Sequence, residues 1–254
     1  MKFFTTTAVA IVLISCGSKE QKKEVTKVDS ITVAALASLT EEQKAEGWRL
    51  LFDGQTTNGW RIFKDKKNTW DVLDGTLHHK GPSGKVTKVD SIPYEDSHIM
   101  SIEEFENFEL AFDWKLSPEA NSGVMFRVTE EFENPEYSGP EYQLIDDQGY
   151  PEKLHDGQHT ADNYAMNFAE NKTVSPVGEW NTSKIVVNGN HVEHRLNGTK
   201  VVEYEIGSAD WLKRKKISKW KDVSGYGMAK KGHILLQDHP YNEVWFKNIM
   251  IKVL

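Results

Sequence analysis

Short runs of alternating apolar and polar residues fill the chain from Trp48 to Leu254, and turn residues separate these runs. Successive side chains of a strand point to opposite faces, so a period of two indicates half-buried β-strands. The pattern therefore predicts an all-β domain. We expect strands at residues 49–52, 70–73, 76–79, 108–116, 123–129, 141–145, 182–188, 191–196, 200–205, 233–237 and 244–253.

Two Asn-Gly pairs, Asn188-Gly189 and Asn197-Gly198, lie between expected strands. Both residues of the tightest hairpin turn need positive φ, which Asn and Gly tolerate best. The two pairs predict a three-stranded meander over residues 182–205. Many short strands with few helices are typical of two packed sheets, so we expect a sandwich of the jelly-roll type.

Three segments depart from the strand pattern. Thr40 and Gln43 form a capping-box pattern, and Gly47 is placed to end that short helix. Residues 147–180 form a long polar loop, and such loops in compact domains are often functional. Residues 208–222 have a helical pattern crowded with lysine. A solvated helix face explains such a basic run, and an anionic glycan partner stays open as the alternative.

The start of the chain has the pattern of an export signal. Lys2 precedes an apolar run over residues 3–14, and Leu13-Ile14-Ser15-Cys16 matches the bacterial lipobox. We expect residues 1–15 to be a lipoprotein signal peptide, cleaved before Cys16, whose thiol then carries lipid. A plain secretory signal with an incidental cysteine is the alternative.

The composition of the chain indicates where the domain begins and which partners it excludes. Residues 16–39 are rich in Lys, Glu, Ser and Thr and predict a flexible tether, followed by one domain over residues 40–254. The net charge of −7 argues against nucleic-acid binding, which needs a basic footprint. A lipidated Cys16 predicts a location in the cell envelope, on the periplasmic or outer surface of a membrane.

Strand parity indicates a polar surface around residue 141. Glu141 and Gln143 fall on one face of their strand, opposite Tyr142 and Leu144, and the same argument places Arg127 on that open surface. Large planar hydrogen-bonding groups of this kind are suited to sugar hydroxyls. An ordinary solvated sheet face with a surface Arg–Glu pair is the competing interpretation.

Several motifs occur in one order along the chain, namely LFDGQTTNGW (51–60), NSGVMFR (121–127), GPEYQLID (139–146), GEWN (178–181), GNHVEHRLNG (189–198), HILLQDH (233–239) and VWFKNIMI (244–251). Together they resemble a known family, the 3-keto-disaccharide hydrolase domain, over residues 48–254. The resemblance implies a concanavalin A-like jelly roll of the lectin and glucanase type, acting on glycosides whose C3 hydroxyl has been oxidised to a ketone. Lys247 departs from the arginine that is common in the closing strand of the family.

A 3-keto sugar changes how a glycosidic bond can be broken, because the ketone acidifies the proton on C2. Elimination across C1 and C2, followed by hydration, needs a general base, an electrophile at the ketone oxygen and an acid for the leaving oxygen. We assign Glu141 as the base, Arg127 or a bound cation as the electrophile, and His239 as the acid. His194, on an apolar strand face, is expected to be a hydrogen-bonded core group.

The remaining candidates would bind the sugar or a metal. Tyr164, Trp180 and Trp60 are candidate stacking platforms for a sugar face. Asp146 and His155 are candidate ligands of a divalent cation, although their spacing matches no strong metal motif and surface acids remain the alternative. The expected substrate-binding set is Gln143, Asp146, Tyr164, Trp180, Asn181 and Gln237.

Two other functions remain open on the sequence. A non-catalytic carbohydrate-binding module would need the aromatic residues and Gln143, but no titrating base. A conventional glycosidase would need two carboxylates flanking the bond, and the sequence shows no obvious second acid on the Glu141 surface. An enzyme for 3-keto-glycosides also implies an upstream sugar 3-oxidoreductase as a partner.

Overall fold

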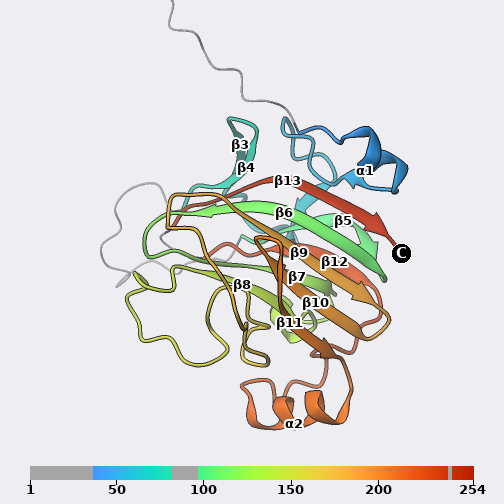
Figure 1. Cartoon of the computed structure of the whole chain (residues 1–254), viewed down its shortest axis with the longest axis vertical. Coiled ribbons are helices and arrows are strands. Elements are labelled where there is room, and N and C mark those ends of the chain that lie inside the picture. Colours follow the sequence, from blue (N-terminus) through green and yellow to red (C-terminus); the bar gives the residue numbers. More distant parts are fainter. Residues whose placement is uncertain (1–36, 82–96, 240–241) are drawn as a thin grey trace, which may run out of the picture. The chain divides into compact units, whose positions relative to one another are not determined.

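The computed structural model describes residues 37–81, 97–239 and 242–254, all of which belong to the unit Ala34–Leu254. The expected signal peptide, Cys16 and most of the expected tether lie outside these residues. Two antiparallel β-sheets form the unit, one of eight strands and one of five (Figure 1). The predicted two-sheet all-β architecture is therefore confirmed.

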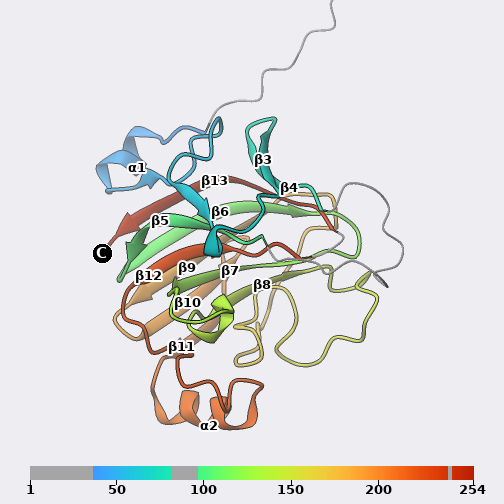
Figure 2. The same ribbon diagram turned by 180° about the vertical axis from the view of Figure 1, so that it is seen from behind.

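The eight-stranded sheet has the order β11-β10-β9-β6-β13-β4-β3, with β1 paired to β13. The five-stranded sheet has the order β2-β5-β12-β7-β8 and is seen from the opposite side in Figure 2. Strands of the first sheet are β1 (Arg49–Leu50), β3 (Trp70–Leu73), β4 (Thr76–His79), β6 (Phe108–Leu116), β9 (Asn181–Asn188), β10 (His191–Leu196), β11 (Thr199–Glu205) and β13 (Val244–Val253). Strands of the second are β2 (Trp60–Ile62), β5 (Ile99–Phe105), β7 (Asn121–Val128), β8 (Glu141–Ile145) and β12 (Gly232–Leu236).

Strands β2 and β5 were missed by the sequence pattern. β2 is only three residues long, and β5 breaks the alternation with three consecutive exposed positions. Hydrogen bonding to β2 on one side and to β12 on the other holds β5 in the sheet. Backbone pairing therefore fixes an element whose side-chain pattern is weak.

Aromatic side chains fill the space between the two sheets. Phe108 of β6 packs edge-on against Phe126 of β7, with ring centroids 6.2 Å apart. Phe112 meets Tyr142 of β8 in the same way at 5.8 Å. The Tyr142 hydroxyl lies 2.9 Å from Ser183 Oγ, so its polar end is hydrogen-bonded in the opposite sheet. Burial of such rings is the main stabilising term of the sandwich.

The predicted meander β9-β10-β11 is confirmed, with one change at its first turn. Asn197 and Gly198 both have positive φ, as expected. In the first hairpin Asn188 still belongs to β9 and pairs with His191, so the turn residues are Gly189 and Asn190. Of these two, Gly189 has positive φ, which is the requirement of a turn with glycine in the first central position.

Helices α1 (Glu41–Ala45) and α2 (Ala209–Ile217) lie at opposite ends of the sandwich (Figure 1). The capping box of Thr40 and Gln43 forms as predicted, and Ser208 caps α2 by accepting from the Trp211 N–H. Two single turns of 3₁₀ helix, η1 (Phe63–Asp65) and η2 (Pro135–Tyr137), complete the described elements. Among the described residues, no helix combines the length and apolarity that a bilayer crossing requires.

Candidate active site

Strand β8 points its side chains alternately into the sandwich and away from it. Tyr142 and Leu144 belong to the central hydrophobic core, so Glu141 and Gln143 face the outer side of the five-stranded sheet. Parity predicted this division correctly. Glu141 is nevertheless only 4% exposed, which means that other parts of the chain cover this face of the sheet.

The long loop between β8 and β9 supplies part of the cover. It pairs along the free edge of β8, because Ala161 N–H donates to Gln143 O at 2.8 Å and Tyr164 N–H donates to Glu141 O at 3.0 Å. These backbone bonds extend the sheet without forming a regular strand. They place Tyr164 directly beside Glu141.

The segment after α2 supplies the rest of the cover over the outer face of the five-stranded sheet. It lies beside the long loop in both views (Figures 1 and 2). Trp220 donates its indole N–H to Tyr164 O at 3.0 Å and stacks on Tyr226, with ring centroids 4.7 Å apart. Trp211 of α2 stacks on the other side of Tyr226 at 5.9 Å. Three stacked rings therefore fix this segment over the sheet.

A cavity of about 200 Å³ lies between these elements, and we call it the Glu141 cavity. It brings together five residues predicted from the sequence and four that were not. The predicted residues are Glu141, Gln143, Tyr164, Gln237 and His239. The residues added by the structure are Asn121, Glu136, Lys219 and Trp220.

The Glu141 carboxyl group is buried in this cavity without a matching donor. Its Oε1 atom has no hydrogen-bond partner in the part of the chain that the structure describes. Burial raises the pKa of Glu141 to about 8, while the positive charge of Lys219 acts to lower it and Glu136 acts to raise it. A carboxyl group that titrates near neutral pH is suited to proton transfer.

Gly123 makes room for Glu141 on the neighbouring strand. A β-carbon on residue 123 would lie too close to Glu141 Oε1 for both atoms to fit, so glycine is needed there for the carboxyl group to occupy its position over β7. The Gly123 carbonyl accepts from the Gln237 N–H at 2.8 Å, which fixes the segment after β12 on the same site. Gln237 Oε1 is a second buried acceptor with no partner among the described residues. Both acceptors belong to residues that line the same cavity, where they are available to hydroxyl groups of a bound ligand.

Arg127 lies elsewhere, and a β-bulge in β7 is the reason. Val128 pairs with His233 and Met125 with Leu235, so three steps along β7 match two along β12. Arg127 takes up the extra residue with φ of +54°, and the alternation reverses there. Met125 and Val128 consequently share one cluster, while Arg127 turns to the opposite side of the sheet.

The Arg127 guanidinium group is used to join the turns at one end of the sandwich. Its Nη2 donates to Glu106 O at 2.9 Å and to Gly189 O at 2.7 Å. Arg127 is 2% exposed, and burial lowers the pKa of its guanidinium group. The expectation that Arg127, Glu141 and Gln143 share one surface is thus corrected. Strand parity predicts which face a side chain lies on only up to the first β-bulge, because the alternation reverses there.

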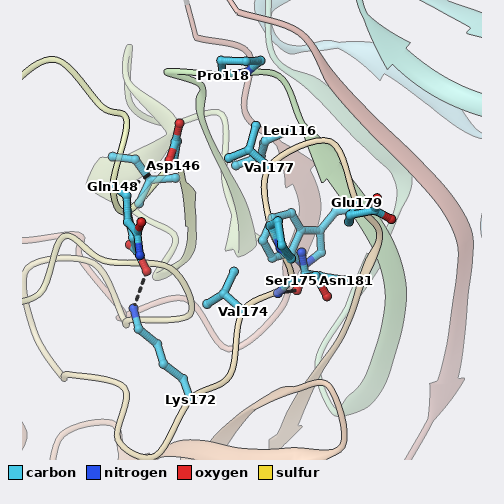
Figure 3. Close-up of a pocket in the computed structure, with 14 residues that line it drawn as sticks. Leu116, Pro118, Asp146, Gln148, Lys172, Val174, Ser175, Val177, Glu179 and Asn181 are labelled. Carbon is cyan, nitrogen blue, oxygen red and sulfur yellow. Dashed lines mark hydrogen bonds and ion pairs between the residues drawn. The ribbon is translucent and has the colours of Figure 1, made fainter.

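Asp146 and Asn181 line a larger cavity of about 640 Å³ (Figure 3). The oxygens of Asp146 accept from the backbone N–H groups of Glu119 and Gly149, and Asn181 Oδ1 accepts from Ser175 N–H. These polar atoms are therefore engaged in holding loops together. The structure separates both residues from those that line the Glu141 cavity.

The other expected aromatic platforms are also placed apart from Glu141. Trp60 is part of the hydrophobic core and donates its indole N–H to Leu51 O at 2.8 Å. Trp180 is half-buried, and the ammonium groups of Lys115 and Lys247 lie 5.3 Å and 4.0 Å from its ring centroid. Of the three candidates, Tyr164 alone lines the Glu141 cavity.

The two candidate metal ligands line different cavities. Asp146 lies in the larger cavity, whereas the exposed His155 lies with Asp156 and Phe168 in another. Across the described ranges, one group of three His, Asp or Glu side chains has ligand atoms close enough for a metal, and it comprises His191, Glu193 and Glu203. Glu193 already accepts from Arg195 at 2.8 Å.

His194 is a core residue, as the sequence indicated. Its Nδ1 lies 2.9 Å from Ala161 O, and its ring packs on Tyr142 with centroids 4.8 Å apart. Burial lowers the pKa of His194 to about 4, so the ring stays neutral at physiological pH. Its hydrogen bond helps to hold the long loop against the sandwich.

Sequence reasoning missed Glu136 and Lys219 for a common reason. Each lies in a segment whose composition is that of a solvated surface, one in the polar connection before β8 and one in the basic run after α2. The bond of Trp220 to Tyr164 O and the pairing of the long loop with β8 bring Lys219 to Glu141. Glu136 lies in η2, and the donation of Gly227 N–H to Ser138 O ties that connection to the segment after α2. Trp220 beside Lys219 was the one available signal, since a tryptophan in a basic segment needs a packing partner.

Comparisons with known proteins agree on one family. A family model described as the 3-keto-alpha-glucoside-1,2-lyase-like domain matches residues 47–252. A curated protein of Bacteroides thetaiotaomicron named 3-keto-disaccharide hydrolase is 32% identical over 279 residues, which span 96% of this chain and 94% of that protein.

Two solved structures from Parabacteroides distasonis, both of candidate glycosyl hydrolases, share the fold. The first has a TM-score of 0.78 and 38% identity, and the match covers 87% of this chain and 100% of that chain. The second has a TM-score of 0.60 and 26% identity, with 82% and 99% covered. The predicted jelly-roll fold class is confirmed by these similarities.

Proposed function

Because the chain belongs to the 3-keto-alpha-glucoside-1,2-lyase-like family and is a hydrolase of glycosidic bonds, we propose that it cleaves 3-keto-glycosides in the Glu141 cavity. The observation that carries this proposal is the buried Glu141 carboxyl group, whose pKa is raised to about 8 and whose Oε1 has no hydrogen-bond partner among the described residues. Its basicity is suited to the C2 proton of a sugar that bears a ketone at C3.

Cleavage proceeds by elimination and hydration. The Glu141 carboxylate takes the proton from C2, and the electron pair of the C–H bond moves into an enolate at C3. The enolate collapses, the bond between C1 and the leaving oxygen breaks, and a C1–C2 double bond forms. His239, which lines the same cavity, gives a proton to the leaving oxygen. Water then adds its oxygen to C1 and gives one proton back to His239, while Glu141 returns the proton to C2.

The other polar residues of the cavity orient the sugar. Gln143 donates to Asn121 Oδ1 at 2.9 Å, which fixes both amide groups, and Gln237 presents an acceptor toward sugar hydroxyls. The Tyr164 ring offers an apolar surface for one face of the sugar. A pure binding module would have no use for a buried carboxyl group with a raised pKa, because that group destabilises the fold when it ionises.

The test is an assay of the purified full-length protein on a 3-keto-glucoside and on its unoxidised parent, with and without a chelator. Cleavage of the keto form alone is expected. Cleavage of the parent at a comparable rate would instead favour a conventional mechanism with paired carboxylates. Glu136 lies in the same cavity and would supply the second acid, although the sequence showed no obvious second acid on the Glu141 surface.

The proposal extends to the cellular setting of the enzyme. A 3-keto-glycoside must be produced by an oxidoreductase that converts the C3 hydroxyl to a ketone, so we infer such an enzyme upstream. The lipobox that ends at Cys16 supports attachment of the chain to a membrane of the cell envelope. A lipid-anchored enzyme would then act on sugars outside the cytoplasm.

A further inference from the structure

Elimination from a 3-keto sugar needs a positive or hydrogen-bonding group at the ketone oxygen, where the enolate charge develops. Arg127 does not meet this need, because its guanidinium group is bonded to Glu106 and Gly189 at one end of the sandwich. The described residues that line the Glu141 cavity include one lysine or arginine, and it is Lys219.

Lys219 is held in place by aromatic rings. Its ammonium group lies 4.6 Å from the centroid of Tyr164 and 4.5 Å from that of Trp220. Both rings attract a cation through their π-electrons. Trp220 is itself fixed by its stacking on Tyr226 and by its bond to Tyr164 O. The cation is therefore positioned before any sugar arrives.

The positive charge of Lys219 acts on Glu141, the proposed base, and lowers the pKa of its carboxyl group. Among the groups that act on Glu141, Lys219 is the one that favours the ionised carboxylate. The titratable or charged groups around Glu141 are Lys219, Glu136, Tyr164, Tyr226 and His239. A cation that stabilises one negative charge in the cavity is able to stabilise another that forms on a bound sugar.

We propose that Lys219 is the catalytic electrophile, which donates a hydrogen bond from its ammonium group to the C3 ketone oxygen while Glu141 removes the C2 proton. This role rests on the proposed function of the Glu141 cavity. No proton leaves Lys219 in the step. The electron pair released at C2 resides on the C3 oxygen beside the ammonium group until the bond at C1 breaks.

The test compares Lys219→Gln and Lys219→Arg with Lys221→Gln in the full-length protein. Lys221 is exposed on the same segment, and its replacement controls for a general loss of positive charge. Loss of one donor to a developing oxyanion usually costs about 10² to 10³ in kcat. We expect a loss of that size for Lys219→Gln on a 3-keto-glucoside, with KM changed less than about tenfold. Lys219→Arg should recover much of the rate, and Lys221→Gln should behave as wild type.

A second readout does not depend on turnover. NMR titration of the Glu141 carboxyl group should show a higher pKa in Lys219→Gln than in wild type, because the cation that favours the carboxylate is gone. An unchanged kcat, or an unchanged pKa of Glu141, would overturn the role of Lys219. If wild type cleaved the parent sugar and the keto sugar equally, or neither, the proposed function would fail first and this role with it.

Discussion

Gly123 and Glu141 lie on adjacent strands, and the Glu141 carboxyl group occupies the space that a side chain at position 123 would fill. Gly123 has an ordinary strand conformation, since its φ is not among the positive values. Glycine is therefore needed here for space and not for backbone freedom. Gly123 therefore determines where the Glu141 carboxyl group lies by leaving space for it, without any side-chain contact.

Replacement of Gly123 by alanine should move the Glu141 carboxyl group and lower kcat by about tenfold or more, because small misplacements of a reacting group are costly. The backbone of β7 accepts alanine without strain, so the protein should stay folded. Activity and thermal unfolding check this expectation. Gly123→Ala should also lower the melting temperature, because the added methyl group meets the Glu141 side chain. In a Glu141→Ala background the methyl group has room, so this loss of stability should disappear. An equal cost in both backgrounds would show that the contact with Glu141 is not the cause.

Glu141→Gln should abolish most activity and stabilise the protein at alkaline pH. The pKa of Glu141 is raised from 4.5 to about 8 in the folded state, so the folded protein keeps a proton that the unfolded chain releases. Wild-type stability should fall as pH rises between these values, by a total on the order of a few kcal/mol. The glutamine variant lacks this loss. Its melting temperature should exceed that of wild type by more at pH 8 than at pH 5.

The matched control for that experiment is Glu152→Gln, because Glu152 is exposed. Its melting curve should shift equally at all three of pH 5, 6.5 and 8. Parallel pH dependence for Glu141→Gln and wild type would contradict a raised pKa in the folded protein. The catalytic loss expected for Glu141→Gln is about 10² to 10⁴ in kcat.

The pH dependence of kcat/KM should report the ionisation of Glu141 in the free enzyme. A general base must be ionised, so kcat/KM should rise about tenfold per pH unit below pH 8 and level off above it. Subtraction of the spontaneous breakdown of the 3-keto sugar is required at each pH. A profile that falls through pH 8 would instead identify Glu141 as an acid in its protonated form.

Arg127→Met should lower stability without lowering kcat. The substitution removes charged hydrogen bonds to the turns at Glu106 and Gly189, and each such bond contributes about 1.5 to 3 kcal/mol. For a domain of this size the melting temperature should fall by several degrees. Turnover of a 3-keto-glucoside measured well below that temperature should match wild type. A loss of kcat comparable to that of Glu141→Gln would return Arg127 to the mechanism.

If the lipobox thiol carries lipid, as we propose, Cys16→Ser should release the protein from the membrane fraction or leave its signal uncleaved. Fractionation of cells and the apparent mass of the processed protein are the measurements. Ser15→Ala, one residue earlier, serves as a control that keeps the thiol. Membrane partition and processing identical to wild type would rule out lipidation at Cys16.

The sequence by itself determined the strands whose side chains alternate and the turns whose residues need positive φ. It also determined that Glu141 and Gln143 face away from the core, because parity is a local property of one strand. The order of motifs along the chain identified the family. Alternation, turn chemistry and parity depend on neighbouring residues only, and the order of motifs is written along the chain itself, so all of them can be read without knowledge of the fold.

Tertiary structure alone decided the composition of the cavity. Arg127 left the shared face because β7 carries a bulge that is defined by its pairing with β12, and a single strand cannot show this. Lys219 joined the site through the packing of Trp220 and the pairing of the long loop with β8, and Glu136 joined it through η2 in the connection between β7 and β8. Contacts between residues far apart in sequence depend on how several elements pack at once. The buried state of Glu141, and with it the raised pKa on which its proposed role as a base depends, is a product of that packing.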